Sequence, residues 1–234
     1  MVASGIIWIC IPIILFKAIY LNVDSIAGWG FSERLVLVGT YTIIDSIMMF
    51  LLINNMVELQ RDIVSGQIDL FLTKPIDPQF YLSFRVMNYS QLFNVLPGLL
   101  MVFYGFSRSS ASFDFFHLCG YLTFLIAGMI LYYCIWLIWT VMSFWFPNIV
   151  GRERLFLDTM QMARFPSDIY KGIFGFSFQY LLPIAFIANP ATKILFGKLS
   201  ISSGISAIVI SLLALVLTRY IWKRGLVAYS GTGS

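Results

Sequence analysis

A long segment without formal charge constrains this chain more than any other feature. Residues 115–146 contain no Asp, Glu, Lys or Arg, although a helix needs only about 20 apolar residues to cross the roughly 30 Å hydrocarbon core of a bilayer. Of the 234 residues, 59% are hydrophobic and 11% are charged, whereas soluble domains carry about 25% charged residues. Too few charges remain to coat a water-soluble globule. The sequence therefore predicts an all-α polytopic membrane protein with about six transmembrane helices.

Six segments are apolar enough to serve as membrane spans. The fifth is short and contains Pro183, which favours a broken or partly re-entrant element over a straight crossing. Together with a polar segment after the second span, the six form a single transmembrane domain over 1–234. The expected spans are 5–21, 35–57, 86–106, 115–139, 172–187 and 205–222, and the polar segment is 58–80.

The distribution of basic residues predicts the orientation. Cytoplasmic loops of membrane proteins carry an excess of Lys and Arg, and a cytoplasmic N-terminus places most basic residues of this chain on that side. We therefore expect both termini in the cytoplasm, in a multi-pass protein of the bacterial cytoplasmic (inner) membrane. The loops 22–34, 107–114 and 188–204 are then external, short and rich in Gly and Ser. The expected cytoplasmic residues are Arg61, Lys74, Arg85, Arg152, Arg154, Arg164, Lys171, Lys223 and Arg224.

Several classes of function lack the residues that they require. His117 is the only histidine, and the three cysteines show no C-x-x-C spacing, so no metal site is predicted. The net charge of +4 comes from few charges and does not indicate nucleic-acid binding. The chain has neither a G-x-S-x-G nucleophile motif nor a G-x-x-x-x-G-K-[ST] phosphate-binding loop. Any energy from ATP must therefore come from a partner.

The polar segment 58–80 is expected to form a rigid element below the membrane. The helix of the second span can continue from Glu58 to Val64, Gly66 is a natural break, and 67–72 can form a short helical turn. Two X-Pro pairs, at 74–75 and 77–78, are expected to stop the helix and give an extended exit. The segment is either an ordinary interfacial loop or a docking element for a cytoplasmic partner.

Several motifs, in this order along the chain, resemble those of the permease subunits of type-2 ABC exporters. The resemblance is to the branch in which a small six-span permease works with a separate ATPase chain, and it covers nearly the whole sequence. The motifs are GQIDLFLTKPIDP at 66–78, FPSDIY at 165–170, LPIAF at 182–186, NPA at 189–191 and WKRGLVAYS at 222–230.

The resemblance implies export of a substrate driven by ATP, which a separate subunit hydrolyses. It implies two copies of that ATP-binding subunit and either a second copy of this chain or a related permease, all within membrane lipid. The chain itself would be no enzyme and would hold no cofactor, because ATP and Mg²⁺ bind to the partner. Segment 58–80 would couple ATP hydrolysis to transport through Asp62, Gly66, Asp69, Lys74, Pro75, Asp77 and Pro78.

Asp45 lies near the middle of the second predicted span, where an ionised carboxylate is costly and indicates a functional site. It is either part of a substrate path with Tyr104 and Tyr133, or a structural group that faces the dimer seam or bonds to Thr42, Ser46 or a neighbouring helix. An alternative function, an ion-coupled secondary transporter that uses Asp45, also stays open, although no inverted repeat is evident. Residues 151–164 are expected to form a charged cytoplasmic helix that touches the ATPase or anionic lipid head groups.

Overall fold

The computed structural model describes residues 14, 25, 28–109, 114–147, 151–170, 172–178 and 182–230. The predicted first span, 5–21, therefore lies almost wholly outside the described residues. The described part of the chain forms α-helices and short 3₁₀-helices (labelled η) and no β-strand, which confirms the all-α class.

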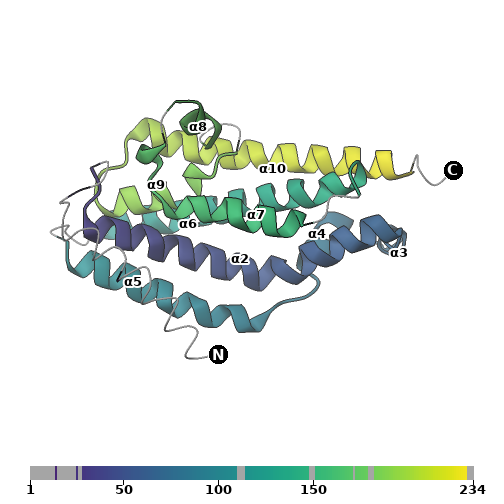
Figure 1. Ribbon diagram of the computed structural model, residues 1–234, viewed down its shortest axis with the longest axis horizontal. Coiled ribbons are helices and arrows are strands. Elements are labelled where there is room, and N and C mark those ends of the chain that lie inside the picture. Colours follow the sequence, from purple (N-terminus) through teal and green to yellow (C-terminus); the bar gives the residue numbers. More distant parts are fainter. Residues whose placement is uncertain are drawn as a thin grey trace.

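Four long helical segments run lengthwise through the molecule (Figure 1). By length and composition, each of the four could cross a membrane. They contain most of the predicted spans 35–57, 86–106, 115–139 and 205–222. The segments are α2 (Phe31–Ser65), η1 with α5 (Tyr89–Asn94, Val95–Ser107), α6 with η2 (Phe115–Val141, Met142–Phe144) and α10 (Ile201–Ser230). We call the two ends of this bundle the Trp29 end, where α2 begins, and the Ser65 end, where α2 ends.

Small residues allow α2 and α5 to pack closely. A Cβ added to Gly39 would lie 2.7 Å from the carbonyl oxygen of Gly98, and a Cβ added to Gly98 would lie 2.9 Å from the carbonyl oxygen of Gly39. Both distances are too short for any side chain, so each helix touches the backbone of the other. Close approach at small residues is typical of membrane helices, which gain little from hydrophobic contact in lipid.

The chain after α6 turns back along the bundle from the Ser65 end. Helix α7 (Arg152–Met160) packs on α6, where the ring of Phe156 stacks on Trp136 with 4.8 Å between ring centres. At its first residue, the guanidinium of Arg152 donates to the hydroxyl of Ser143. The segment is therefore packed against the bundle from its beginning and does not stand apart from it as a separate helix.

Two short helices, η3 (Gln161–Arg164) and η4 (Ser167–Ile169), carry this segment on to the Trp29 end. There Trp29 Nε1 donates to the carboxylate of Asp168 at 2.8 Å. The separate charged helix expected over 151–164 is thus not found. Arg164 lies over Tyr41, towards the Trp29 end, and so away from Arg61 and Lys74, with which it was expected on one side of the membrane. The charged residues of 151–164 lower the mean hydropathy of this segment. For that reason hydropathy alone does not predict that the segment runs the length of the bundle.

Residues 172–195 form two separate helices in place of the expected span 172–187. Helix α8 (Gly172–Phe176) is short, and α9 (Ala185–Leu195) begins just after Pro183. Helix α9 runs along α6 towards the Trp29 end, because Ile187 lies against Gly128 while Ile194 lies against Gly120. The predicted break in this segment is therefore confirmed, and the element that follows the break is re-entrant in form.

The expected external loop from residue 188 is wrong over 188–195, which are helical and largely buried. Within the NPA motif of this helix, the side chain of Asn189 is buried. Its side-chain oxygen accepts a hydrogen bond from the backbone amide of Ser167 at 2.8 Å. This bond joins α9 to η4 and gives the buried amide a partner.

Candidate functional site

Residues 58–85, which include the expected polar segment 58–80, form a helical hairpin at the Ser65 end. Helix α2 continues to Ser65 and ends at Gly66, whose φ of 79° is the left-handed conformation that glycine adopts readily. The next residues form the single turn α3 (Asp69–Leu72), and the side chain of Ile68 is fully buried. The predicted continuation of the second span, the break at Gly66 and the short turn are all confirmed.

The exit from this hairpin is helical, which contradicts the expected extended exit. Asp77 is the N-cap of α4 (Pro78–Phe84) and accepts a hydrogen bond from the amide of Phe80 at 3.0 Å. Pro78 occupies the first helical position, where its missing N–H costs nothing and its fixed φ suits a helix. The Asp-Pro pair therefore starts a helix, and only the Lys-Pro pair before it terminates one.

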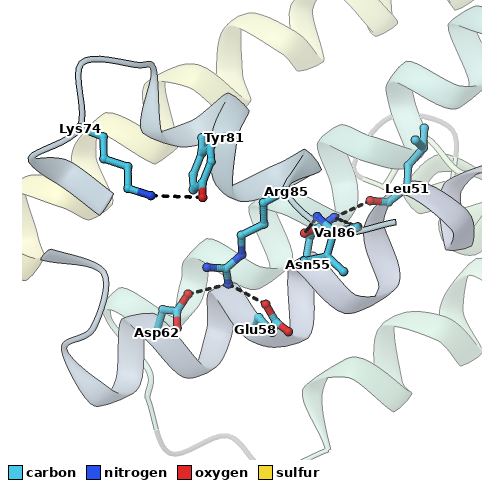
Figure 2. A network of polar contacts seen from close by, with 8 residues as sticks. All are labelled: Leu51, Asn55, Glu58, Asp62, Lys74, Tyr81, Arg85 and Val86. Carbon is cyan, nitrogen blue, oxygen red and sulfur yellow. Dashed lines mark hydrogen bonds and ion pairs between the residues drawn. The ribbon is translucent and has the colours of Figure 1, made fainter. Parts of the chain in front are cut away.

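An ion-paired arginine fastens α4 to the end of α2 (Figure 2). The Arg85 guanidinium lies 2.7 Å from Asp62 and 3.1 Å from Glu58, and its centre lies 4.8 Å from the centre of the Phe71 ring. Asp62 is buried, with 6% of its surface exposed. The predicted coupling residue Asp62 is thus an internal anchor of the hairpin.

The buried side-chain amide of Asn55 makes a second connection between α2 and the chain that follows α4. Asn55 donates to the carbonyl of Val86 at 2.6 Å and accepts from its amide at 2.9 Å, as Figure 2 shows. It also donates to the carbonyl of Leu51 at 2.6 Å. Sequence reasoning missed Asn55, although an amide side chain inside an apolar span indicates a group that needs hydrogen-bond partners there.

Lys74 holds the turn between α3 and α4. Its ammonium group donates to the Tyr81 hydroxyl at 3.2 Å and lies 4.4 Å and 5.0 Å from the ring centres of Tyr81 and Phe71. Pro75 and Asp69 are exposed. Of these predicted coupling residues, Asp62 is therefore buried, Lys74 is exposed but bonded within the hairpin, and Asp69 and Pro75 are exposed.

The hairpin is also tied to two helices distant in sequence. Arg219 of α10 donates to Asp77 at 3.1 Å and to Gln79 at 2.9 Å, and the Tyr229 hydroxyl of α10 donates to the Gly66 carbonyl at 3.1 Å. From α6, the Tyr133 hydroxyl accepts a hydrogen bond from the side-chain amide of Gln79 at 3.3 Å. The hairpin therefore contacts α2, α6 and α10. Sequence reasoning missed Arg219, since it lay inside the expected span 205–222.

The pH dependence of the link between Asp77 and Arg219 follows from its charges. The hydrogen bond and positive charge of Arg219 hold the pKa of Asp77 below its usual value, so this carboxylate stabilises the fold above the unfolded pKa of about 3.9 and loses that effect as pH falls through the folded pKa. We expect Asp77→Asn to lower the thermal unfolding temperature at pH 7, with a cost below about 1 kcal/mol because the pair is half exposed. The difference from the unmodified protein should shrink below about pH 4. A difference that grows on acidification would contradict this assignment.

The three residues of the expected substrate path lie against different partners. Asp45 accepts hydrogen bonds from the Tyr41 hydroxyl at 3.2 Å and from the Tyr132 hydroxyl of α6 at 2.8 Å. Tyr133 faces the hairpin, and the exposed ring of Tyr104 lies 5.5 Å from the guanidinium of Arg108. These hydrogen bonds are those of a structural group that connects α2 to α6. The partners of Asp45 are Tyr41 and Tyr132, and not the expected Thr42 or Ser46.

These features define a multi-pass helical membrane protein in which one polar hairpin is joined to three long helices. A family model described as ABC-2 family transporter protein matches residues 6–233. The chain belongs to this family and is a transmembrane permease subunit of an ABC transporter. No curated protein and no solved structure matches the chain.

Proposed function

We propose that this permease exports its substrate across the cytoplasmic membrane, and that two copies of a separate ATP-binding subunit supply the energy. The hairpin 58–85 carries this proposal, because its contacts reach α2, α6 and α10 at once. A subunit that binds ATP and Mg²⁺ docks on this hairpin from the cytoplasm. The second permease of the complex is another copy of this chain or a related one, and both termini lie on the cytoplasmic side.

The connections of the hairpin suit it to transmit movement. Helix α2 is continuous with the hairpin, so a displacement of α3 tilts α2 directly. Arg219 passes the same displacement to α10 and Tyr133 passes it to α6. Closure of the ATP-binding subunits therefore shifts the balance between two arrangements of these helices, and the permease contributes differential binding of substrate to each.

The outer face of the hairpin has the composition of a docking surface. Leu70, Ile76 and Phe80 are 68%, 47% and 69% exposed, beside the exposed Asp69 and Pro75. Apolar side chains at the centre of a polar rim are typical of protein interfaces. A groove of about 1030 Å³ between α2 and α7, lined by Arg61, Glu153 and Arg154 among others, opens at the same end. A subunit docked at this end reaches both features.

The docking surface is tested by placing charge on it. We expect Phe80→Asp to reduce the amount of ATPase that co-purifies with the tagged permease at least tenfold, because burying an unpaired carboxylate at an interface costs more than about 1.4 kcal/mol. The measurement is the ratio of ATPase to permease after purification in mild detergent.

The matched control is Ile201→Asp, which adds the same charge to a residue 84% exposed at the Trp29 end. This control should keep the ATPase bound, and both variants should elute as folded protein in size-exclusion chromatography. An unchanged ratio in Phe80→Asp, or an equal loss in the control, would overturn the docking assignment.

A further inference from the structure

An apolar groove lies between α6, α10 and the turn that precedes α9. Its volume is about 670 Å³, within the roughly 300–1,000 Å³ range of small-molecule sites. Residues Ile138 and Trp139 line one wall, Leu213 and Leu217 line the other, and Pro183 lies in the lining between them. The groove is therefore built from two long membrane helices and the tip of the re-entrant element.

The chemistry of this groove suits a hydrocarbon chain. The walls are apolar, and Leu213, Val216 and Leu217 are 61%, 70% and 50% exposed on a helix that is apolar enough to cross a membrane. The indole nitrogen of Trp139 already donates to the carbonyl of Arg152 at 3.0 Å. The groove thus presents apolar surface to the bilayer, where acyl chains are the surrounding medium.

Two basic side chains, Lys223 and Arg224, lie beyond the groove towards the Ser65 end. Tyr220 lines the groove, and Lys223 and Arg224 follow it by three and four positions, which places all three on one face of α10. Arg224 Nε donates to the Tyr220 hydroxyl at 3.0 Å, and the guanidinium centre lies 5.2 Å from the centre of the tyrosine ring. Within the described residues, Lys223 and the terminal amino groups of Arg224 have no hydrogen-bond or ion-pair partner.

We propose that this groove binds one anionic phospholipid of the leaflet at the Ser65 end. An acyl chain occupies the groove beside Pro183, and the head-group phosphate binds Lys223 and Arg224. Basic residues at the membrane-facing end of a helix attract anionic head groups by about 1 kcal/mol each. The site is independent of the proposed ATPase and lies next to Arg219, the residue that links α10 to the hairpin.

The probe is phosphatidylglycerol added to the purified full-length permease, with bound lipid counted by native mass spectrometry. We expect one phosphatidylglycerol per chain to be retained, and phosphatidylcholine to be retained at least tenfold less well. The double replacement of Lys223→Gln and Arg224→Gln should weaken retention of phosphatidylglycerol at least about tenfold. Ala214→Trp, which fills the groove, should have a similar effect, and Leu217→Trp serves the same purpose if the first variant does not fold.

The matched control removes two exposed cations elsewhere at the same end, with Arg61→Gln and Arg154→Gln. Retention equal to that of the unmodified chain in this control supports a defined site. An equal loss in the control would show diffuse electrostatic attraction and would overturn the proposal. Disulfide-linked dimers of a Leu213→Cys variant, with lipid retention unchanged by Ala214→Trp, would show that a second copy of the chain covers the groove and would also overturn it.

Discussion

Replacement of Gly128 by alanine is expected to remove most of the folded protein. A Cβ at this position of α6 would overlap the backbone carbonyl oxygen of Ile187 in α9, and a backbone oxygen cannot rotate away. Helices α6 and α9 would have to separate, and overpacking of this kind costs about 1–3 kcal/mol or more. The measurement is the fraction of protein that stays monodisperse in detergent after heating, followed by size-exclusion chromatography.

Gly120→Ala is the matched control for this prediction. It lies two turns earlier on the same helix, and its added Cβ would meet the Cδ1 atom of Ile194 at 2.7 Å, which is the far end of a flexible side chain that can change rotamer. We expect a much smaller loss of thermal stability than for Gly128→Ala. Equal losses from the two variants would contradict the placement of α9 against α6.

The second large effect is expected for Arg85→Ala, which leaves Asp62 buried without its cationic partner. Removal of one member of a buried ion pair costs about 3–5 kcal/mol, and this pair joins α4 to α2 at 2.7 Å. We expect the hairpin to open, with a lower unfolding temperature and faster chymotryptic cleavage after Phe71. The readouts are thermal unfolding in detergent and the rate of limited proteolysis at that bond.

Two variants separate the ion pair from a general loss of charge. Arg61→Ala removes an exposed arginine from the same part of α2 and should leave both readouts unchanged. Combining Arg85→Met with Asp62→Leu replaces both charges by apolar groups, which is often neutral in a buried pair, and should restore much of the stability. If Arg85→Ala behaves like Arg61→Ala, the pair does not hold the hairpin closed.

Local features of the hairpin were predictable because short-range chemistry determines them. The continuation of α2 past Glu58 and its end at Gly66 follow from helix periodicity and from the left-handed φ that glycine adopts. The contacts that connect the hairpin to the bundle were not predictable in the same way. Arg219 and Asp77 are 142 residues apart in sequence, and only the tertiary fold brings them together.

The position of 151–164 was mispredicted for a different physical reason. A mean hydropathy counts all charged residues of this segment alike, whereas in the folded protein each charged side chain has its own surroundings. Arg152 is buried and bonds to the Ser143 hydroxyl, and the guanidinium of Arg164 lies 5.1 Å from the ring centre of Tyr41. Charged groups that each have a hydrogen-bond or cation–π partner in this manner do not prevent a segment from running the length of the bundle.

The central claim is that a separate ATPase drives this permease through the hairpin at the Ser65 end. The most direct test is purification of the tagged chain from its native host in mild detergent, followed by mass spectrometry of the proteins that remain bound. Our account predicts an ATP-binding subunit in amounts about equal to the permease, with or without a second permease. A homo-oligomer of this chain, purified without any ATP-binding subunit under conditions that preserve other transporter complexes, would contradict it.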